Sequence, residues 1–309
     1  MRRREFTIGA LLAAMAREVY AQEKPNQHRI AIVIPSGDVS SISDKGTTID
    51  RYSGEARPEG HAELARQVVD GKPDVIVAAN NAVATAARAT TDTIPIVWIG
   101  GDPVEAGFAT SLAHPGGNVT GVTVFAGTEI WGKRLQILKE AVPAASKAAY
   151  LTTRVSLAAE GQQLRKAGRQ LGIAVIELAL DEVSATAIER AFTEIVQQQS
   201  DAFLVNSNSL LFPYRQLIVG LAEKNRLPAL YPWREYVEAG GLMAYASDNR
   251  ELWRRMADDV HEILDGAKPG DIPIYQPTKF ELVINLKTAE ALGLKIPPSL
   301  LARADEVIE

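Results

Sequence analysis

The chain has 309 residues, of which 46% are hydrophobic and 23% charged, so it can form a large core and exceeds one typical domain. A net charge of -5 without a basic stripe argues against nucleic acid as a partner. With no cysteine and only four scattered histidines, the chain offers no disulfide, thiolate metal site or recognisable catalytic triad. We therefore expect two domains, no metal and no cofactor.

The first 21 residues have the order of an export signal. Arginines from Arg2 to Arg4 precede an apolar run from Ile8 to Met15, and small residues end the segment at Ala21, as in a cleaved leader. The pattern Arg-Arg-x-Phe that ends at Phe6 resembles a twin-arginine signal. We expect a periplasmic protein. The alternative is an uncleaved N-terminal helix, because charged residues follow the short apolar run.

Residues 22–28 predict a polar linker, after which short apolar runs alternate with amphipathic stretches almost to the C-terminus. The runs predict parallel strands at 30–35, 74–79, 94–99, 119–124, 148–152, 174–178, 202–205, 229–231 and 241–244. The amphipathic stretches predict helices at 61–70, 82–90, 130–141, 156–171, 185–199, 214–224 and 251–264. This alternation predicts an α/β fold with doubly wound parallel sheets. No later run approaches the roughly 18 apolar residues of a membrane span, so we expect no membrane insertion of the mature chain.

So many strands seldom form one sheet, which favours two Rossmann-like lobes. The segment 114–121, with its Pro-Gly-Gly-Asn sequence, is a candidate crossing between them. An ordinary surface turn is the alternative for the same residues.

Ligands of open α/β sheets bind at the carboxyl ends of strands, so the polar residues that follow the apolar runs are the candidates. In the first half these are Ser36, Asn80, Asn81 and Asp102. The two asparagines begin a helix whose free N–H groups suit a ligand carboxylate, although capping alone explains them equally well. Asp102 can pair with a ligand ammonium, and its alternative is an Asx turn before a proline.

The second half offers a further set at its strand ends. Trp233 and its neighbouring rings can stack on a flat ligand, and Arg234 can fork to a carboxylate. The alternatives are a core position for one ring and a local ion pair for the arginine. The full set is Thr153, Asn206, Tyr231, Trp233, Arg234 and Tyr245.

Enzyme patterns are missing from the sequence. There is no G-x-G-x-x-G after the first strand and no Walker lysine loop. The carboxylate pairs at 181–182 and 258–259 lie on or beside predicted helices, where solvated faces are the simpler interpretation. We expect a protein that is not an enzyme.

Several blocks of sequence stand out by their order and spacing. They are RRREF from Arg2, IPIV from Ile94 with GDPV from Gly101, HPGGNVTG from His114, YPxRE from Tyr231 with AGGLM from Ala239, and QPTKFELVINLKTA from Gln276 with PPSLL from Pro297. Together they resemble the ABC transporter substrate-binding protein family, in the branch that includes aromatic amino acid binders.

This resemblance implies a type 1 periplasmic binding fold, with two lobes joined by a multi-strand hinge and a ligand between them. The lobes expected are residues 29–121 plus about 245–271, and residues 122–244 plus about 272–309. The implied function is the solute-binding component of an ABC importer, a monomer that captures a small carboxylate-bearing ligand by hinge closure and docks on a membrane permease. An exported sensory module and a degenerate, non-transporting relative are the alternatives.

The chain also departs from the family pattern. Between Pro35 and His61 it is shorter than usual by roughly a helix. Asn80 and Asn81 stand where relatives carry a loop of the Gly-Thr-Pro-Ser type. Both changes affect the wall of the expected ligand site.

Overall fold

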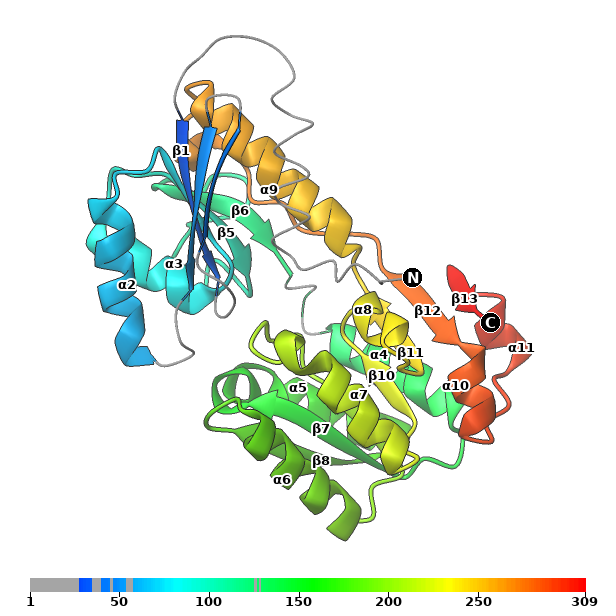
Figure 1. The fold of residues 1–309 in the computed structure, drawn as a ribbon. Coiled ribbons are helices and arrows are strands. Elements are labelled where there is room, and N and C mark those ends of the chain that lie inside the picture. The colour runs from blue at the N-terminus through cyan, green and yellow to red at the C-terminus, as the bar shows by residue number, and fades with distance from the viewer. Residues whose placement is uncertain (1–27, 35–39, 45–46, 54–57, 125–126, 128) are drawn as a thin grey trace. The chain divides into compact units, whose positions relative to one another are not determined.

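The computed structural model describes residues 28–34, 40–44, 47–53, 58–124, 127 and 129–309 (Figure 1). The predicted export signal, most of the linker and Ser36 lie outside the described residues. The chain forms two compact units. Unit 1 comprises Met1–Phe125 and Asn249–Pro277, and unit 2 comprises Ala126–Asp248 and Thr278–Glu309.

Unit 1 contains a six-stranded sheet with the order β2-β3-β1-β4-β5-β6. All neighbouring strands are parallel except β2, which runs antiparallel to β3. The strands are β1 (His28–Ile34), β2 (Ser40–Asp44), β3 (Thr47–Ser53), β4 (Val75–Ala78), β5 (Ile96–Gly100) and β6 (Val119–Thr123).

Helices cover both faces of this sheet (Figure 1). On one face, α2 (Pro58–Asp70) and α3 (Asn81–Thr90) pack over a core that includes the fully buried Trp98. On the other, α9 (Asn249–Leu264) places Leu252 and Met256 against the sheet. A 3-10 helix, η2 (Pro269–Asp271), follows α9. Burial on both faces explains why the central strands are continuous apolar runs.

Gly121 allows β5 and β6 to pair closely. It lies opposite Trp98 in the register and has a φ of +133°, which residues with a side chain rarely adopt. A Cβ at this position would overlap the backbone of Trp98. The segment 114–118 leads directly into β6, so residues 114–121 lie within unit 1 and the prediction that they cross between the lobes is wrong.

Unit 2 contains a seven-stranded sheet with the order β13-β12-β11-β10-β9-β7-β8. The pairs from β8 to β11 are parallel, β12 is antiparallel to β11, and β13 is parallel to β12. The strands are β7 (Lys147–Thr153), β8 (Ala174–Leu180), β9 (Ala202–Val205), β10 (Ala229–Tyr231), β11 (Met243–Ala246), β12 (Glu281–Asn285) and β13 (Glu306–Ile308).

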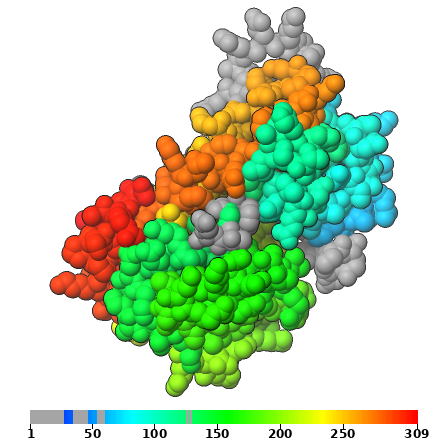
Figure 2. Space-filling view, turned by 180° about the vertical axis from the view of Figure 1, so that it is seen from behind, coloured from blue at the N-terminus to red at the C-terminus, as the bar shows by residue number. Residues whose placement is uncertain are grey.

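Two hydrophobic clusters lie on the faces of this sheet. One joins α6 (Ala185–Gln197), η1 (Phe212–Tyr214), α7 (Arg215–Lys224) and α8 (Arg234–Glu238). The other joins α4 (Glu129–Ala141), α5 (Arg154–Leu171), α10 (Leu286–Ala291) and α11 (Pro298–Leu301). In Figure 2 the C-terminal segment, in red, lies beside the green surface of α4, and Arg303 donates to Glu140 at 2.8 Å across this contact.

The fold class predicted from the sequence is confirmed: every predicted strand and helix appears, in two parallel-sheet units. The differences lie in segments for which the sequence predicted no helix or strand. Between β1 and α2 the described residues form β2 and β3, whose sequences are too polar to resemble buried strands. Near the C-terminus β12 and β13 form one edge of the sheet of unit 2, and both run antiparallel to the other strands of that sheet. No helix in the described part of the chain has the length and apolarity needed to span a membrane.

Replacing Gly121 by alanine should lower the free energy of unfolding by about 2–4 kcal/mol, because the new methyl group meets the Trp98 backbone in a strained conformation. Urea denaturation measures the change. Gly117→Ala is the matched control, since nothing lies within 4 Å of the place that its new methyl group would take. Equal stability of the two variants would contradict the close approach.

Asp259 should make unit 1 less stable as the pH rises. It lies on the core-facing stripe of α9, 9% exposed, and its Oδ2 has no hydrogen-bond partner. Burial, with the nearby charges of Glu262 and Asp258, raises its pKa to about 7. Because this is above the unfolded value of 3.8, the folded state binds more protons between about pH 4 and 7, and stability falls as pH rises through that range.

Asp259→Asn should therefore stabilise the protein at pH 8 by up to about 4 kcal/mol, and should flatten the dependence between pH 5 and 8. Urea denaturation at a series of pH values tests this. Asp258→Asn, next to it on the exposed side of α9, should retain most of the slope. An unchanged slope in Asp259→Asn would show that another group titrates.

Candidate functional site

Asn80 and Asn81 begin α3 at the carboxyl end of β4, and they have different partners. Asn80 is the N-cap, and its Oδ1 accepts from the backbone N–H of Val83 at 2.8 Å. Asn81 turns toward the next strand, where its Oδ1 accepts from the indole Nε1 of Trp98 at 3.0 Å and from the N–H of Gly101 at 3.1 Å. Asn81 therefore fixes the turn that follows β5.

The turn itself is held from both sides. Thr123, at the end of β6, donates its hydroxyl to the carbonyl of Gly101 at 2.6 Å. A Cβ on Gly100 would overlap the Asn81 side chain, so glycine is required there. Asp102 forms the Asx turn considered above, with Oδ1 accepting from Val104 N at 2.8 Å and Glu105 N at 3.1 Å. The carboxyl edge of unit 1 is thus a rigid polar surface.

In unit 2, polar side chains meet where β7 and β9 end. Thr153 caps α5, and its hydroxyl donates to Ser156 Oγ at 3.0 Å. The amide of Asn208 donates to Thr153 Oγ1 at 3.3 Å and to Ser156 Oγ at 3.2 Å. Asn206 Oδ1 accepts from the N–H of Asn208 at 2.7 Å, which links these groups to a deeper set.

The deeper set consists of two buried residues, Tyr150 and Asn206, and the half-buried Glu160 of α5. Asn206, 1% exposed, donates to the hydroxyl of Tyr150 at 2.5 Å and to Glu160 Oε2 at 2.7 Å. Tyr150 donates to the same Glu160 oxygen at 2.9 Å. Burial, and then the charge of Glu160, raise the pKa of Tyr150 well above its ordinary value, so it stays a neutral donor. We call Tyr150, Thr153, Ser156, Glu160, Asn206 and Asn208 the polar cluster of unit 2.

A buried arginine accompanies this cluster. Arg134, on α4, is 5% exposed, donates from Nε to the carbonyl of Tyr245 at 3.1 Å and lies 5.0 Å from the ring of Trp131. Burial lowers its pKa to about 10, against the opposing effects of Tyr150 and Glu160. It therefore keeps its charge at neutral pH.

The aromatic residues predicted for the site are largely core residues. Tyr231 is 1% exposed and stacks on Tyr236 with ring centroids 5.0 Å apart. Trp233 is 7% exposed and meets the edge of Phe212 at 5.2 Å. Only Tyr245, half-buried beside Phe280 at 5.7 Å, lies on the face of the polar cluster.

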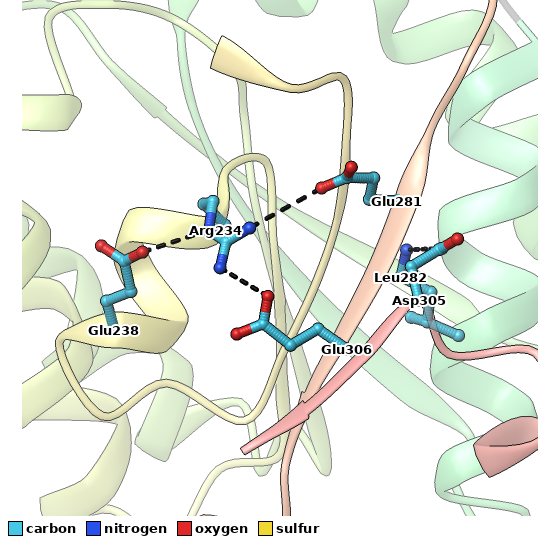
Figure 3. Close-up of polar contacts among 6 residues, drawn as sticks. All are labelled: Arg234, Glu238, Glu281, Leu282, Asp305 and Glu306. Carbon is cyan, nitrogen blue, oxygen red and sulfur yellow. Dashed lines mark hydrogen bonds and ion pairs between the residues drawn. The ribbon is translucent and has the colours of Figure 1, made fainter. Parts of the chain in front are cut away.

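Arg234 is surrounded by carboxylates of its own unit (Figure 3). It lies 3.1 Å from Glu238, 3.7 Å from Glu281 and 2.6 Å from Glu306. Burial opposes its charge, but the hydrogen bonds of Glu306 and Glu238 outweigh burial and raise its pKa. This network ties α8 to β12 and β13. It also occupies the guanidinium that the sequence suggested for a ligand carboxylate.

The predicted residues thus form two separate groups in unit 2 and one in unit 1. Thr153, Asn206 and Tyr245 lie with the polar cluster, whereas Tyr231, Trp233 and Arg234 belong to the aromatic core and the ion-pair network. Sequence reasoning passes over Arg134, Tyr150 and Glu160, because each lies inside an element and not at its end. The one available indication is their polar character at core-facing positions.

The chemistry that these groups support is binding by hydrogen bonds and charge. Among the described residues, no group of three His, Cys, Asp or Glu side chains could hold a metal ion. The hydroxyl, amide and carboxylate groups converge at carboxyl strand ends, where open α/β sheets bind small molecules.

Comparisons with known proteins agree with this chemistry. The family model described as ABC transporter substrate binding protein matches residues 37–308. A protein of Clostridioides difficile (strain R20291), named tyrosine-binding protein, is 26% identical over 268 residues, which cover 84% of this chain and 76% of that protein. Both the name and the family describe proteins that bind a substrate, not enzymes.

Solved structures share the fold. A conserved domain protein from Vibrio cholerae has a TM-score of 0.80 and 24% identity, covering 91% of this chain and 100% of its own. A structure from Streptococcus pneumonia, described as an ABC domain in complex with L-Trp, has a TM-score of 0.80 and 23% identity, covering 92% and 100%. The two parallel-sheet units are those of the type 1 periplasmic binding proteins, and the match over residues 37–308 shows that the chain belongs to the family of ABC transporter substrate binding proteins.

Proposed function

We propose that this protein is the extracytoplasmic solute-binding component of an ABC importer, and that it captures a small carboxylate-bearing ligand of the aromatic amino acid type by hinge closure. Its partner in this role is a membrane permease. The basic and apolar N-terminal residues support export, and the arginine pair that ends at Arg4 supports the twin-arginine route.

The polar cluster of unit 2 is the observation that carries this proposal. It gathers donors and acceptors from β7, α5 and the segment after β9, and it buries Tyr150, Thr153 and Asn206 among them. Buried polar groups with fixed partners orient a small ligand without any covalent step. The names of the relatives, a tyrosine binder and a structure with L-Trp, support the ligand class.

We assign Asn81, Asp102, Thr153, Asn206 and Tyr245 to the ligand site. Asn80 acts as the cap that holds Asn81 at the start of α3. Tyr231, Trp233 and Arg234 act through packing and ion pairs that fix the shape of unit 2. We also assign Ser36, which follows β1 in the sequence, to the ligand site.

L-Tyrosine or L-tryptophan should raise the melting temperature of the purified protein. Ligand at about 100 times its Kd stabilises the folded state by about 2.7 kcal/mol, which corresponds to a shift of roughly 5 °C or more for a chain of this size. Differential scanning fluorimetry measures the shift, with D-glucose as the control. No shift with any amino acid or aromatic acid would count against the proposal, and conversion of a bound compound into a product would replace it with an enzyme.

Replacing Asn81 by alanine should weaken ligand binding about tenfold, because the Gly101 turn and the Trp98 indole lose their shared acceptor. Titration calorimetry measures the affinity, and a change in tryptophan emission reports the loss of the hydrogen bond to the Trp98 indole. Asn80→Asp, which keeps an N-cap acceptor at the neighbouring position, is the control. Wild-type affinity in Asn81→Ala would exclude the turn from the site.

A further inference from the structure

Arg134 carries an unused donor in a buried place. Its Nε is bonded to the Tyr245 carbonyl, but its Nη1 is buried and has no hydrogen-bond partner. An unsatisfied cationic N–H inside a protein is strongly unfavourable. In native structures such a group is rare and calls for an explanation, and an acceptor brought by a ligand is one.

A purely structural role explains only part of this arrangement. The bond from Nε to Tyr245 is enough to tie α4 to β11, and stacking on Trp131 needs only the flat face of the guanidinium. Neither contact uses Nη1. The residue is 5% exposed and its Nη1 is buried, so a ligand would reach this donor only where the surrounding side chains move apart.

The negative charge of Glu160 near Arg134 indicates which net charge the ligand should carry. Burial lowers the pKa of Arg134, and the negative charge of Glu160 is one of the effects that oppose burial and favour the charged guanidinium. A ligand that brings a carboxylate alone would upset this balance, because the new negative charge would lie near Glu160. A zwitterion brings its own ammonium and leaves the local charge balanced, which low-dielectric sites favour.

We propose that Arg134 and Glu160 form the head-group subsite of unit 2 for a zwitterionic α-amino acid, with Nη1 of Arg134 taking the ligand carboxylate and Glu160 facing its ammonium. Arginine suits this task because its planar fork matches a carboxylate. The inference rests on the proposed function and deepens it, because it assigns the carboxylate and the ammonium of the amino acid to two named residues of unit 2.

Titration calorimetry with three probes tests the subsite: L-tyrosine, L-tyrosinamide, which lacks the carboxylate, and 3-(4-hydroxyphenyl)propanoate, which lacks the amine. The wild-type protein should bind the amide and the propanoate about 10- to 100-fold more weakly than L-tyrosine. Arg134→Gln should lose the discrimination between L-tyrosine and its amide. Glu160→Gln should lose the discrimination between L-tyrosine and the propanoate.

The ratio of two affinities is the readout because a change that only disturbs folding weakens all probes alike. Arg134→Lys keeps the positive charge but lacks the planar guanidinium. Its ratio of affinities for L-tyrosine and the amide should lie between those of the wild type and Arg134→Gln, and it replaces Arg134→Gln if that variant fails to fold. Arg165→Gln removes an exposed arginine of α5 that pairs with Glu177, and should keep the wild-type ratio.

An unchanged ratio in both Arg134 variants would overturn the subsite while leaving the proposed function intact. Equal binding of acid and amide by the wild-type protein would overturn it as well. A parallel series uses L-tryptophan and its amide. If the wild-type protein binds neither L-tyrosine nor L-tryptophan, both the proposed function and the subsite are overturned.

Discussion

Parallel pairing of strands is the constraint on which this structure depends. Parallel strands need crossovers that cover both faces of a sheet, and they bring all their carboxyl ends to one edge. In unit 1 that edge receives Asn81, the Gly101 turn and Thr123, and in unit 2 it receives Thr153 and Asn206. None of these side chains is near another in sequence, so the topology alone creates both polar surfaces.

Each unit contains a buried ionisable side chain, and the two differ in the charges that surround them. In unit 2 the buried Arg134 lies near an opposite charge on Glu160 and near neutral donors, so it remains charged. In unit 1 burial, and then the like charges of Glu262 and Asp258, raise the pKa of Asp259 to about 7. Arg134 therefore stays a cation that a ligand can bind. Asp259 is more easily accommodated when it is protonated, so the stability of unit 1 depends on pH.

The sequence predicted the two parallel sheets because their central strands are continuous apolar runs. This pattern is typical of strands whose sheet is covered by helices on both faces. It missed β3 because Thr47, Asp50 and Arg51 belong to a strand near the sheet edge, where polar residues are tolerated. Asn81 and Asn206 follow the ends of β4 and β9, as the sequence predicted. Their partners were not predictable, since Trp98 and Glu160 meet them only through tertiary packing.

Arg234 and Arg134 show why position in sequence is a weak guide to function. Arg234 stands at a strand mouth, where a ligand is expected, yet three carboxylates of its own unit surround it (Figure 3). A ligand carboxylate would have to displace them and would meet their repulsion. Arg134 lies inside a helix and gives no such indication in the sequence, yet its Nη1 still lacks an acceptor. The donor that can add binding free energy is the one that folding has left without a partner, because a saturated donor only exchanges one acceptor for another.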